Sequence, residues 1–155
     1  MNNEKSVHEK YMRECLTLAK KGVCQVSPNP MVGCIIVKNG KVVGRGYHKI
    51  FRGPHAEVFA LANAGKKAVG STLYVTLEPC SHFGKTPPCV DFLVRHRPKR
   101  VVIAMQDPFP AVAGRGIQSL RDNSIQVDVG VLDESILVRV RVTRVVHHPG
   151  GGRIF

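Results

Sequence analysis

The sequence has 155 residues, of which 43% are hydrophobic, so it is long enough and apolar enough for one domain with a buried core. Its formal net charge at pH 7 is +12. No apolar run approaches the roughly 20 residues of a membrane-spanning helix, and the N-terminus lacks the apolar segment of a signal peptide. We therefore expect a cytoplasmic protein that makes no contact with a membrane.

The positive charge is scattered along the chain, and no run of five or six like charges occurs. Four basic residues, Arg139, Arg141, Arg144 and Arg153, lie in the last part of the sequence, where no acidic residue follows Glu134. A solvated basic surface is the first interpretation of this charge, and attraction of a phosphorylated small molecule is the second. A nucleic-acid partner is the third and is not expected.

The predicted elements alternate after an opening helix and hairpin. Residues 7–21 have one apolar face and end before Gly22, and residues 31–47 form two apolar runs around Asn39-Gly40, a typical hairpin turn. The remaining predicted elements are a helix at 55–65, a strand at 71–78, a helix at 87–96, a strand at 100–105, a helix at 116–123 and a strand at 125–132. This order predicts an α/β protein, a three-layer α/β/α sandwich around a mixed sheet of about five strands.

The end of the chain has a different pattern. Residues 136–146 alternate apolar and polar side chains as an exposed strand does, and residues 147–155 show no packable pattern. We therefore divide the chain into a domain at 1–134 and an atypical basic tail at 135–155 that is expected to be partly disordered. The exposed alternating edge could pair with another chain.

The cysteines point to a metal site. Their odd number, five, argues against the disulfide framework of a secreted protein, and a close pair in a reducing compartment suggests metal binding or redox chemistry. Cys80 follows a predicted strand, Cys89 begins a predicted helix, and His55 begins an earlier helix. One His and two Cys can hold a tetrahedral Zn²⁺ and leave its fourth position open, as catalytic zinc requires. Cys15, Cys24 and Cys34 are interpreted as small apolar residues.

Glu57 favours a catalytic zinc over a structural one. It lies two residues after His55, where a carboxylate beside the metal can move protons between water, a ring nitrogen and departing ammonia. The order H-x-E followed by P-C and a second cysteine is the pattern of zinc deaminases that act on nucleobases. A purely structural zinc site and a chance coincidence of common tripeptides remain as alternatives.

The spacing of the two cysteines then carries a resemblance to a family. Nucleic-acid-editing deaminases typically have P-C-x-x-C, whereas this chain has eight residues between the cysteines in "EPCSHFGKTPPC". With "SPNPMVGCIIVKNGKVVGRGYH", "PHAEVFAL" and "VAGRGI", the chain from about residue 8 to 132 resembles the deaminase domain of the riboflavin-biosynthesis bifunctional deaminase/reductase, within the cytidine deaminase-like superfamily. The resemblance implies zinc-dependent hydrolytic deamination of 2,5-diamino-6-ribosylamino-pyrimidin-4-one 5′-phosphate with release of ammonia. It also implies a dimer or larger homo-oligomer.

The resemblance implies a role for each matching position. His55, Cys80 and Cys89 match the zinc ligands, and Glu57 matches the proton shuttle. The positions that match substrate contacts are Asn29, His48, Lys85 and Asp107. Lys suits a phosphate as a point charge, and Asp can accept hydrogen bonds from sugar hydroxyls or ring N–H groups. For His82, in the cysteine loop, a structural role is favoured over substrate contact.

The chain departs from the family pattern in two places. Phe109 stands where the family usually has Asn, which removes one polar group from the expected substrate contacts. Residues 135–155 do not resemble the family's linker to a reductase domain, so no reductase is expected in this chain. The alternatives are a tRNA or nucleotide deaminase of the same fold, which the charge favours and the cysteine spacing opposes, and a catalytically impaired remnant stabilised by zinc.

Overall fold

A computed structural model describes residues 2–84 and 86–132 of the chain, which form a mixed five-stranded sheet covered by helices. The strands are β1 (Gly33–Lys38), β2 (Lys41–Tyr47), β3 (Thr72–Leu77), β4 (Arg100–Met105) and β5 (Gln126–Val129). The α-helices are α1 (Asn2–Ala19), α2 (Ala56–Ala64), α3 (Cys89–His96) and α4 (Arg115–Asp122), and short 3₁₀ turns η1 (Lys20–Gly22) and η2 (Gly65–Ala68) follow α1 and α2.

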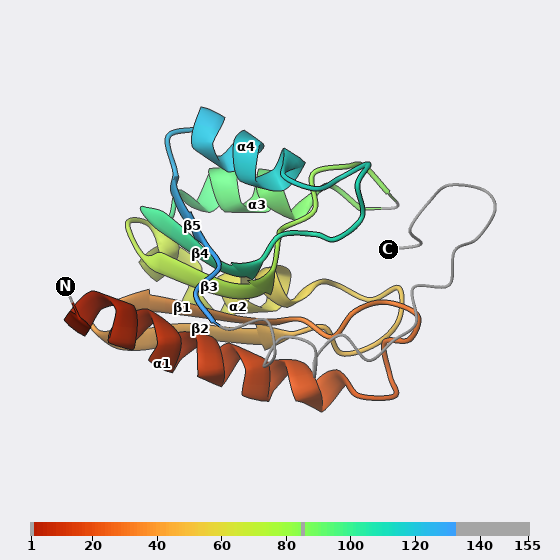
Figure 1. Cartoon of the computed structure of the whole chain (residues 1–155), viewed down its shortest axis with the longest axis horizontal. Helices are drawn as coiled ribbons and strands as arrows, with labels where there is room; N and C mark the ends of the chain where they lie inside the picture. The colour runs from red at the N-terminus through yellow and green to blue at the C-terminus, as the bar shows by residue number, and fades with distance from the viewer. Residues whose placement is uncertain (1, 85, 133–155) are drawn as a thin grey trace.

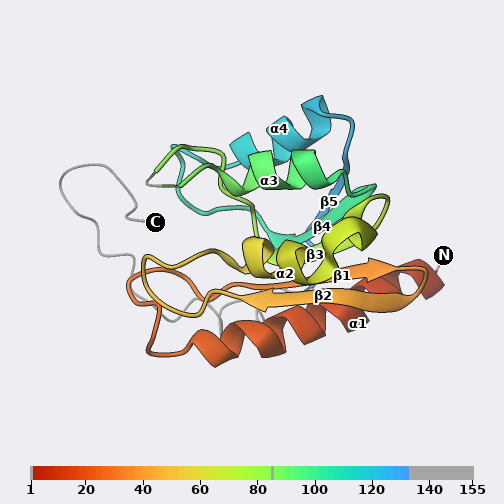
Figure 2. The ribbon, with the colours of Figure 1, turned by 180° about the vertical axis from the view of Figure 1, so that it is seen from behind.

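The strand order in the sheet is β2-β1-β3-β4-β5. The hairpin strand β1 runs antiparallel to both β2 and β3, whereas β3, β4 and β5 are parallel to one another. Helix α1 covers one face of the sheet, and α2, α3 and α4 cover the other (Figures 1 and 2). The three-layer α/β/α sandwich predicted from the sequence is therefore confirmed.

Two cores, one on each face, follow from the alternation of side chains along the strands. In β1, Ile35 packs with α1 in one core, and Ile36 packs with α2 in the other. Both side chains have no exposed surface. Strands buried on both faces read as continuous apolar runs, which is why "GCIIV" lacks the alternation of a half-exposed strand.

The hairpin turn lies where the sequence predicts it, whereas helix α1 begins earlier than predicted. Asn39 and Gly40 have φ of 52° and 72°, the positive values that a two-residue hairpin turn requires. Helix α1 begins at Asn2, five positions before the start that the apolar pattern predicts. Its first turn is fully polar, so the apolar face that marks a helix in a sequence begins only further along.

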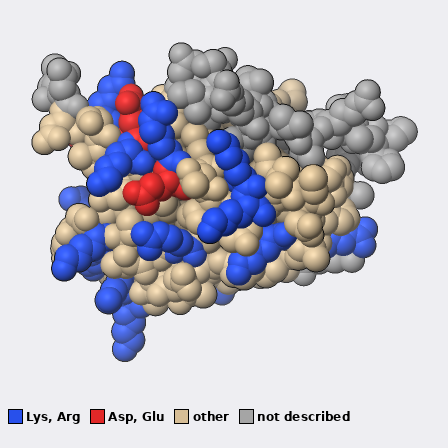
Figure 3. Space-filling model, turned by 90° about the horizontal axis from the view of Figure 1, so that it is seen from below, with Lys and Arg blue, Asp and Glu red and all other residues tan. Residues whose placement is uncertain are grey.

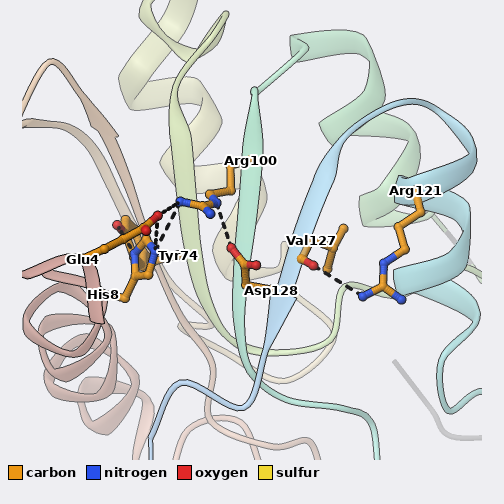
Figure 4. A network of polar contacts seen from close by, with 7 residues as sticks. All are labelled: Glu4, His8, Tyr74, Arg100, Arg121, Val127 and Asp128. Carbon is orange, nitrogen blue, oxygen red and sulfur yellow. Dashed lines mark hydrogen bonds and ion pairs between the residues drawn. The ribbon is translucent and has the colours of Figure 1, made fainter. Parts of the chain in front are cut away.

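A polar network ties the N-terminal half of α1 to the sheet, at the end where β4 begins (Figure 4). The Arg100 guanidinium forms ion pairs with Glu4 of α1 and with Asp128 of β5, the latter at 2.7 Å between Nε and Oδ2. His8 Nδ1 lies 2.9 Å from the Tyr74 hydroxyl. The Arg100 guanidinium therefore joins α1 to β4 and β5, and His8 joins α1 to β3.

The surface charge, the cysteines outside the candidate metal site and the hydropathy of the helices each bear on a prediction from the sequence. On the face seen in Figure 3, Lys and Arg side chains are spread among uncharged residues and do not form one continuous stripe. Cys15 and Cys34 are buried, which agrees with their interpretation as small apolar residues, whereas Cys24 is exposed and has φ of 63°. No helix within residues 2–84 and 86–132 has the length and hydropathy needed to cross a membrane.

Candidate active site

Three donor atoms of the predicted metal set lie together. His55 Nδ1, Cys80 Sγ and Cys89 Sγ are all within 4.8 Å of one another. His55 Nδ1 is 3.1 Å from Cys89 Sγ and 3.7 Å from Cys80 Sγ. A tetrahedral zinc ion, with Zn–S near 2.3 Å and Zn–N near 2.0 Å, separates its ligand atoms by roughly 3.5–3.8 Å. The donor types and their spacing therefore fit zinc with small adjustments.

Helix starts and a strand end bring these residues together. His55 is the N-cap residue of α2, Cys89 is the first residue of α3 after the N-cap Pro88, and Cys80 lies three residues beyond the end of β3. The Cys89 backbone N–H donates to Cys80 Sγ at 3.1 Å. Because helix N-termini carry partial positive charge, both helices favour the negative charge that two thiolates bring to the site.

The two thiols hold their protons very differently. A hydrogen bond from the Cys89 thiol lowers the pKa of Cys80 to about 4, with further help from His55 and from the Cys89 backbone N–H. The same hydrogen bond, together with burial, raises the pKa of Cys89. Cys80 therefore loses its proton readily, whereas Cys89 keeps its own. A bound cation would displace the proton of Cys89.

Glu57 occupies the first turn of α2, and only 3% of it is exposed. Burial raises the pKa of its carboxyl group, although the neighbouring His55 opposes this. A carboxyl group with a raised pKa holds a proton more readily than an exposed one, which suits a group that takes part in proton transfer. Glu57 lines the same pocket as His55 and Cys80, so such transfers would take place at the metal set.

Asn29 and His48 form a hydrogen-bonded pair on one wall of this pocket, and both are buried. His48 Nδ1 lies 3.1 Å from the carbonyl oxygen of Pro54, which can only accept, so Nδ1 carries the proton. His48 Nε2 is then an acceptor for the Asn29 side-chain amide at 3.4 Å. Burial lowers the pKa of His48, which keeps this neutral arrangement.

Asp107 lies beyond the end of β4, also lines the pocket, and is 7% exposed. Its Oδ1 accepts a hydrogen bond from the Phe109 backbone N–H at 2.9 Å. His82 also lines the pocket, whereas Phe109 contributes no side chain to the lining formed by the described residues. Lys85 and residues 133–155 lie outside the described residues.

Seven predicted site residues line one pocket, and Cys89 lies beside two of them, His55 and Cys80; the seven are Asn29, His48, His55, Glu57, Cys80, His82 and Asp107. Sequence reasoning missed Glu78, Ser81 and Val112, which also line it. A signal for Glu78 was present, because a charged residue directly after a buried strand is costly unless polar groups surround it. Ser81 and Val112 carry no such signal.

Residues 5–105 match the family described as the cytidine and deoxycytidylate deaminase zinc-binding region. The chain belongs to this deaminase family. The matched range spans His55, Glu57, Cys80 and Cys89, and the match confirms the predicted cytidine deaminase-like superfamily.

Individual relatives place the deaminase chain more closely. It is 54% identical over 130 residues to the riboflavin biosynthesis protein RibD of Aquifex aeolicus, covering 84% of this chain but 36% of that protein. It is 50% identical to the diaminohydroxyphosphoribosylamino-pyrimidine deaminase of Buchnera aphidicola subsp. Schizaphis graminum, covering 80% of this chain and 84% of that one. The deaminase chain thus spans about a third of the first of these relatives and most of the second.

A solved structure supports the same placement. The structure of Acinetobacter baumannii RibD, form 2, superposes with a TM-score of 0.87 at 46% identity, covering 89% of this chain and 39% of that one. The dCMP deaminase of cyanophage S-TIM5, at 23% identity and a TM-score of 0.62, shares the fold. The cytidine deaminase-like fold predicted from the sequence is therefore confirmed.

Proposed function

We propose that this deaminase chain hydrolyses the exocyclic amino group of a diaminohydroxyphosphoribosylaminopyrimidine and releases ammonia, as a step of riboflavin biosynthesis. One observation carries the proposal. Three zinc-type donor atoms meet at the N-termini of α2 and α3, and a buried carboxyl group, Glu57, faces the same pocket two residues after the histidine. The name of the Buchnera relative, which has almost the same extent, supports the choice of substrate.

In this proposal His55, Cys80 and Cys89 hold a catalytic Zn²⁺. Bound there, the ion would lower the pKa of a water molecule to about 7 and supply a nucleophile near neutral pH. A set of three protein donors, rather than four, is the donor count of a catalytic zinc site and not of a structural one. The partial positive charge at the N-termini of α2 and α3 would favour two thiolate ligands once a cation is bound.

Glu57 moves the protons of the reaction. Its carboxylate oxygen takes a proton from the attacking water and gives it to a ring nitrogen of the pyrimidine. It then carries the second proton of the water to the departing amino group, so that water and the amine become a ring carbonyl and ammonia. The raised pKa of the carboxyl group suits a residue that must accept and release protons in one turnover.

The remaining residues would hold the substrate. Asn29 and His48 present hydrogen-bonding groups at the pocket, and Asp107, which also lines it, can accept from ring N–H groups or sugar hydroxyls. Lys85, which lies outside the described residues, is proposed to pair with the phosphate. His82 supports the cysteine loop, and Phe109 supplies a backbone N–H to Asp107 where the family usually places an Asn side chain.

The experiment is ammonia release from the diaminopyrimidine ribosyl phosphate by the purified chain, with and without a zinc chelator. We expect turnover that the chelator abolishes and added Zn²⁺ restores, with dCMP turned over at least a hundredfold more slowly. Ammonia release that is indifferent to the chelator would contradict the zinc chemistry. Faster release from dCMP than from the diaminopyrimidine would contradict the proposed substrate.

A further inference from the structure

Glu78 makes more hydrogen bonds to the backbone than its place in the sequence suggests. It directly follows β3, two residues before Cys80, and is 6% exposed. Its Oε2 accepts from the backbone N–H groups of Asp107 and Gly114, at 2.9 and 3.0 Å. Its Oε1 accepts from those of Gly116 and Ile117, at 2.9 and 3.2 Å.

These four bonds join parts of the chain that are 29 to 39 residues away from Glu78. Asp107 follows β4, Gly114 precedes α4, and Gly116 and Ile117 belong to the first turn of α4. The N–H groups of a first helical turn have no partner within the helix, and the partial positive charge there favours a carboxylate. Glu78 therefore fastens the whole 107–117 segment to the strand end that leads to Cys80.

A close backbone approach supports this interpretation independently. A Cβ atom built on Gly116 would lie 2.1 Å from the carbonyl oxygen of Pro79 and 3.2 Å from Glu78 Cγ. Only glycine lets the start of α4 come this near to the residue before Cys80. The α4 end and the Cys80 end of β3 are thus packed against each other with no space for adjustment.

Glu78 lines the pocket, yet its bonding leaves it poorly suited to proton transfer. An ionised carboxylate offers acceptors only, and Glu78 directs both of its oxygens to backbone donors. The hydrogen bonds of Glu78 instead affect Asp107. The Asp107 backbone N–H donates to Glu78, and Asp107 Oδ1 accepts from the Phe109 backbone N–H. One bond therefore holds the backbone of Asp107 and the other holds its side chain at the pocket.

We infer that Glu78 is a positioning residue, which clamps the 107–117 segment so that Asp107 meets the substrate in the correct place. The statement about substrate rests on the proposed function, whereas the clamp itself does not. Glu78 acts through Asp107 on binding, and the chemical step at Glu57 and the metal set does not depend on it.

The test replaces Glu78 with Gln, which keeps the shape but turns one oxygen into an amide NH₂ that faces two backbone donors. We expect the KM for the diaminopyrimidine phosphate to rise at least tenfold, with kcat within about threefold of the parent and zinc content unchanged. Asp107→Ala should raise KM by a similar factor. Added to Asp107→Ala, Glu78→Gln should raise KM by less than twofold more, because the residue that it positions is gone.

Glu14→Gln, the same chemical change on α1 across the sheet, is the matched control and should leave KM unchanged. A Glu78→Gln variant that melts earlier but keeps the parent's KM would show a merely structural role and overturn the inference. The inference would also be overturned if the double variant raised KM by the product of the two single effects. Loss of zinc together with activity in Glu78→Gln would overturn it as well. If the Gln variant does not fold, Glu78→Asp, with its carboxylate one methylene shorter, is subject to the same criteria.

Amide hydrogen exchange separates this inference from the proposed function, because it requires no turnover. The amides of Asp107, Gly114, Gly116 and Ile117 should exchange at least tenfold faster in Glu78→Gln or Glu78→Asp than in the parent. Unchanged exchange at these four amides would refute the clamp even if the parent is an active deaminase. Faster exchange in a chain that releases no ammonia would retain the clamp and reject the proposed function.

Discussion

Replacing Glu57 with Gln removes proton transfer from the site while preserving the shape of a side chain that is 3% exposed. A single general acid–base transfer typically contributes about 10²–10⁴-fold to the rate, and Glu57 is proposed to serve several transfers. We therefore expect kcat to fall by at least about 10⁴-fold, which corresponds to roughly 5.5 kcal/mol in the activation free energy.

The Glu57→Gln substitution should have little effect on the stability of the fold. Burial raises the pKa of Glu57, which means that the fold disfavours its ionised form. A neutral amide of equal size does not carry that desolvation cost, so the free energy of unfolding should fall by no more than about 1 kcal/mol. The His55, Cys80 and Cys89 donor atoms are untouched, and zinc content should equal that of the parent.

The assay measures zinc content, ammonia release and thermal unfolding on one preparation of each protein. Glu57→Asp, which withdraws the carboxylate by one methylene, should show a rate between those of the parent and the Gln variant. Glu14→Gln on α1 serves as the control for the loss of one carboxylate elsewhere. Full zinc content with turnover within tenfold of the parent would remove Glu57 from the mechanism.

Three further predictions concern the core, the metal and pH. Leu73→Ala, at a fully buried site of β3, should lower the free energy of unfolding by about 2–5 kcal/mol in denaturant titrations, whereas Val69→Ala at a 41% exposed site should change it by less than about 0.5 kcal/mol. A chelator should lower the Tm of the zinc-loaded chain by roughly 10 °C, and Zn²⁺ but not Mg²⁺ should restore it; an unchanged Tm would argue against a bound metal. Burial lowers the pKa of His48 from 6.5, so the unfolded chain binds this proton more readily; the stability that neutral His48 contributes is complete above about pH 6.5 and is lost as the pH falls through the folded-state pKa. His48→Gln should therefore flatten the decline of Tm below pH 6.5, and a parallel decline in both proteins would contradict this.

The sequence by itself predicted the helices and strands, their order and the three donor residues that the structure brings together. Local features suffice for these, since the period of apolar residues, the Asn39-Gly40 turn and the glycine after α2 act over a few neighbouring residues. The three candidate ligands His55, Cys80 and Cys89 could be predicted because each stands at the start of a helix or just after a strand, and such positions leave a recognisable pattern. Glu57 was found through its fixed distance from His55.

Only the tertiary structure decided which distant polar groups meet. Asn29 pairs with His48 across 19 residues of sequence, and Glu78 receives donors from Asp107 and from the start of α4. No local pattern encodes these pairs, because a backbone N–H group is present at almost every residue and becomes a specific partner only when packing brings it to an acceptor. The parallel pairing of β3 with β4 places the ends of both strands at one edge of the sheet, and burial there requires that each charge find its donors.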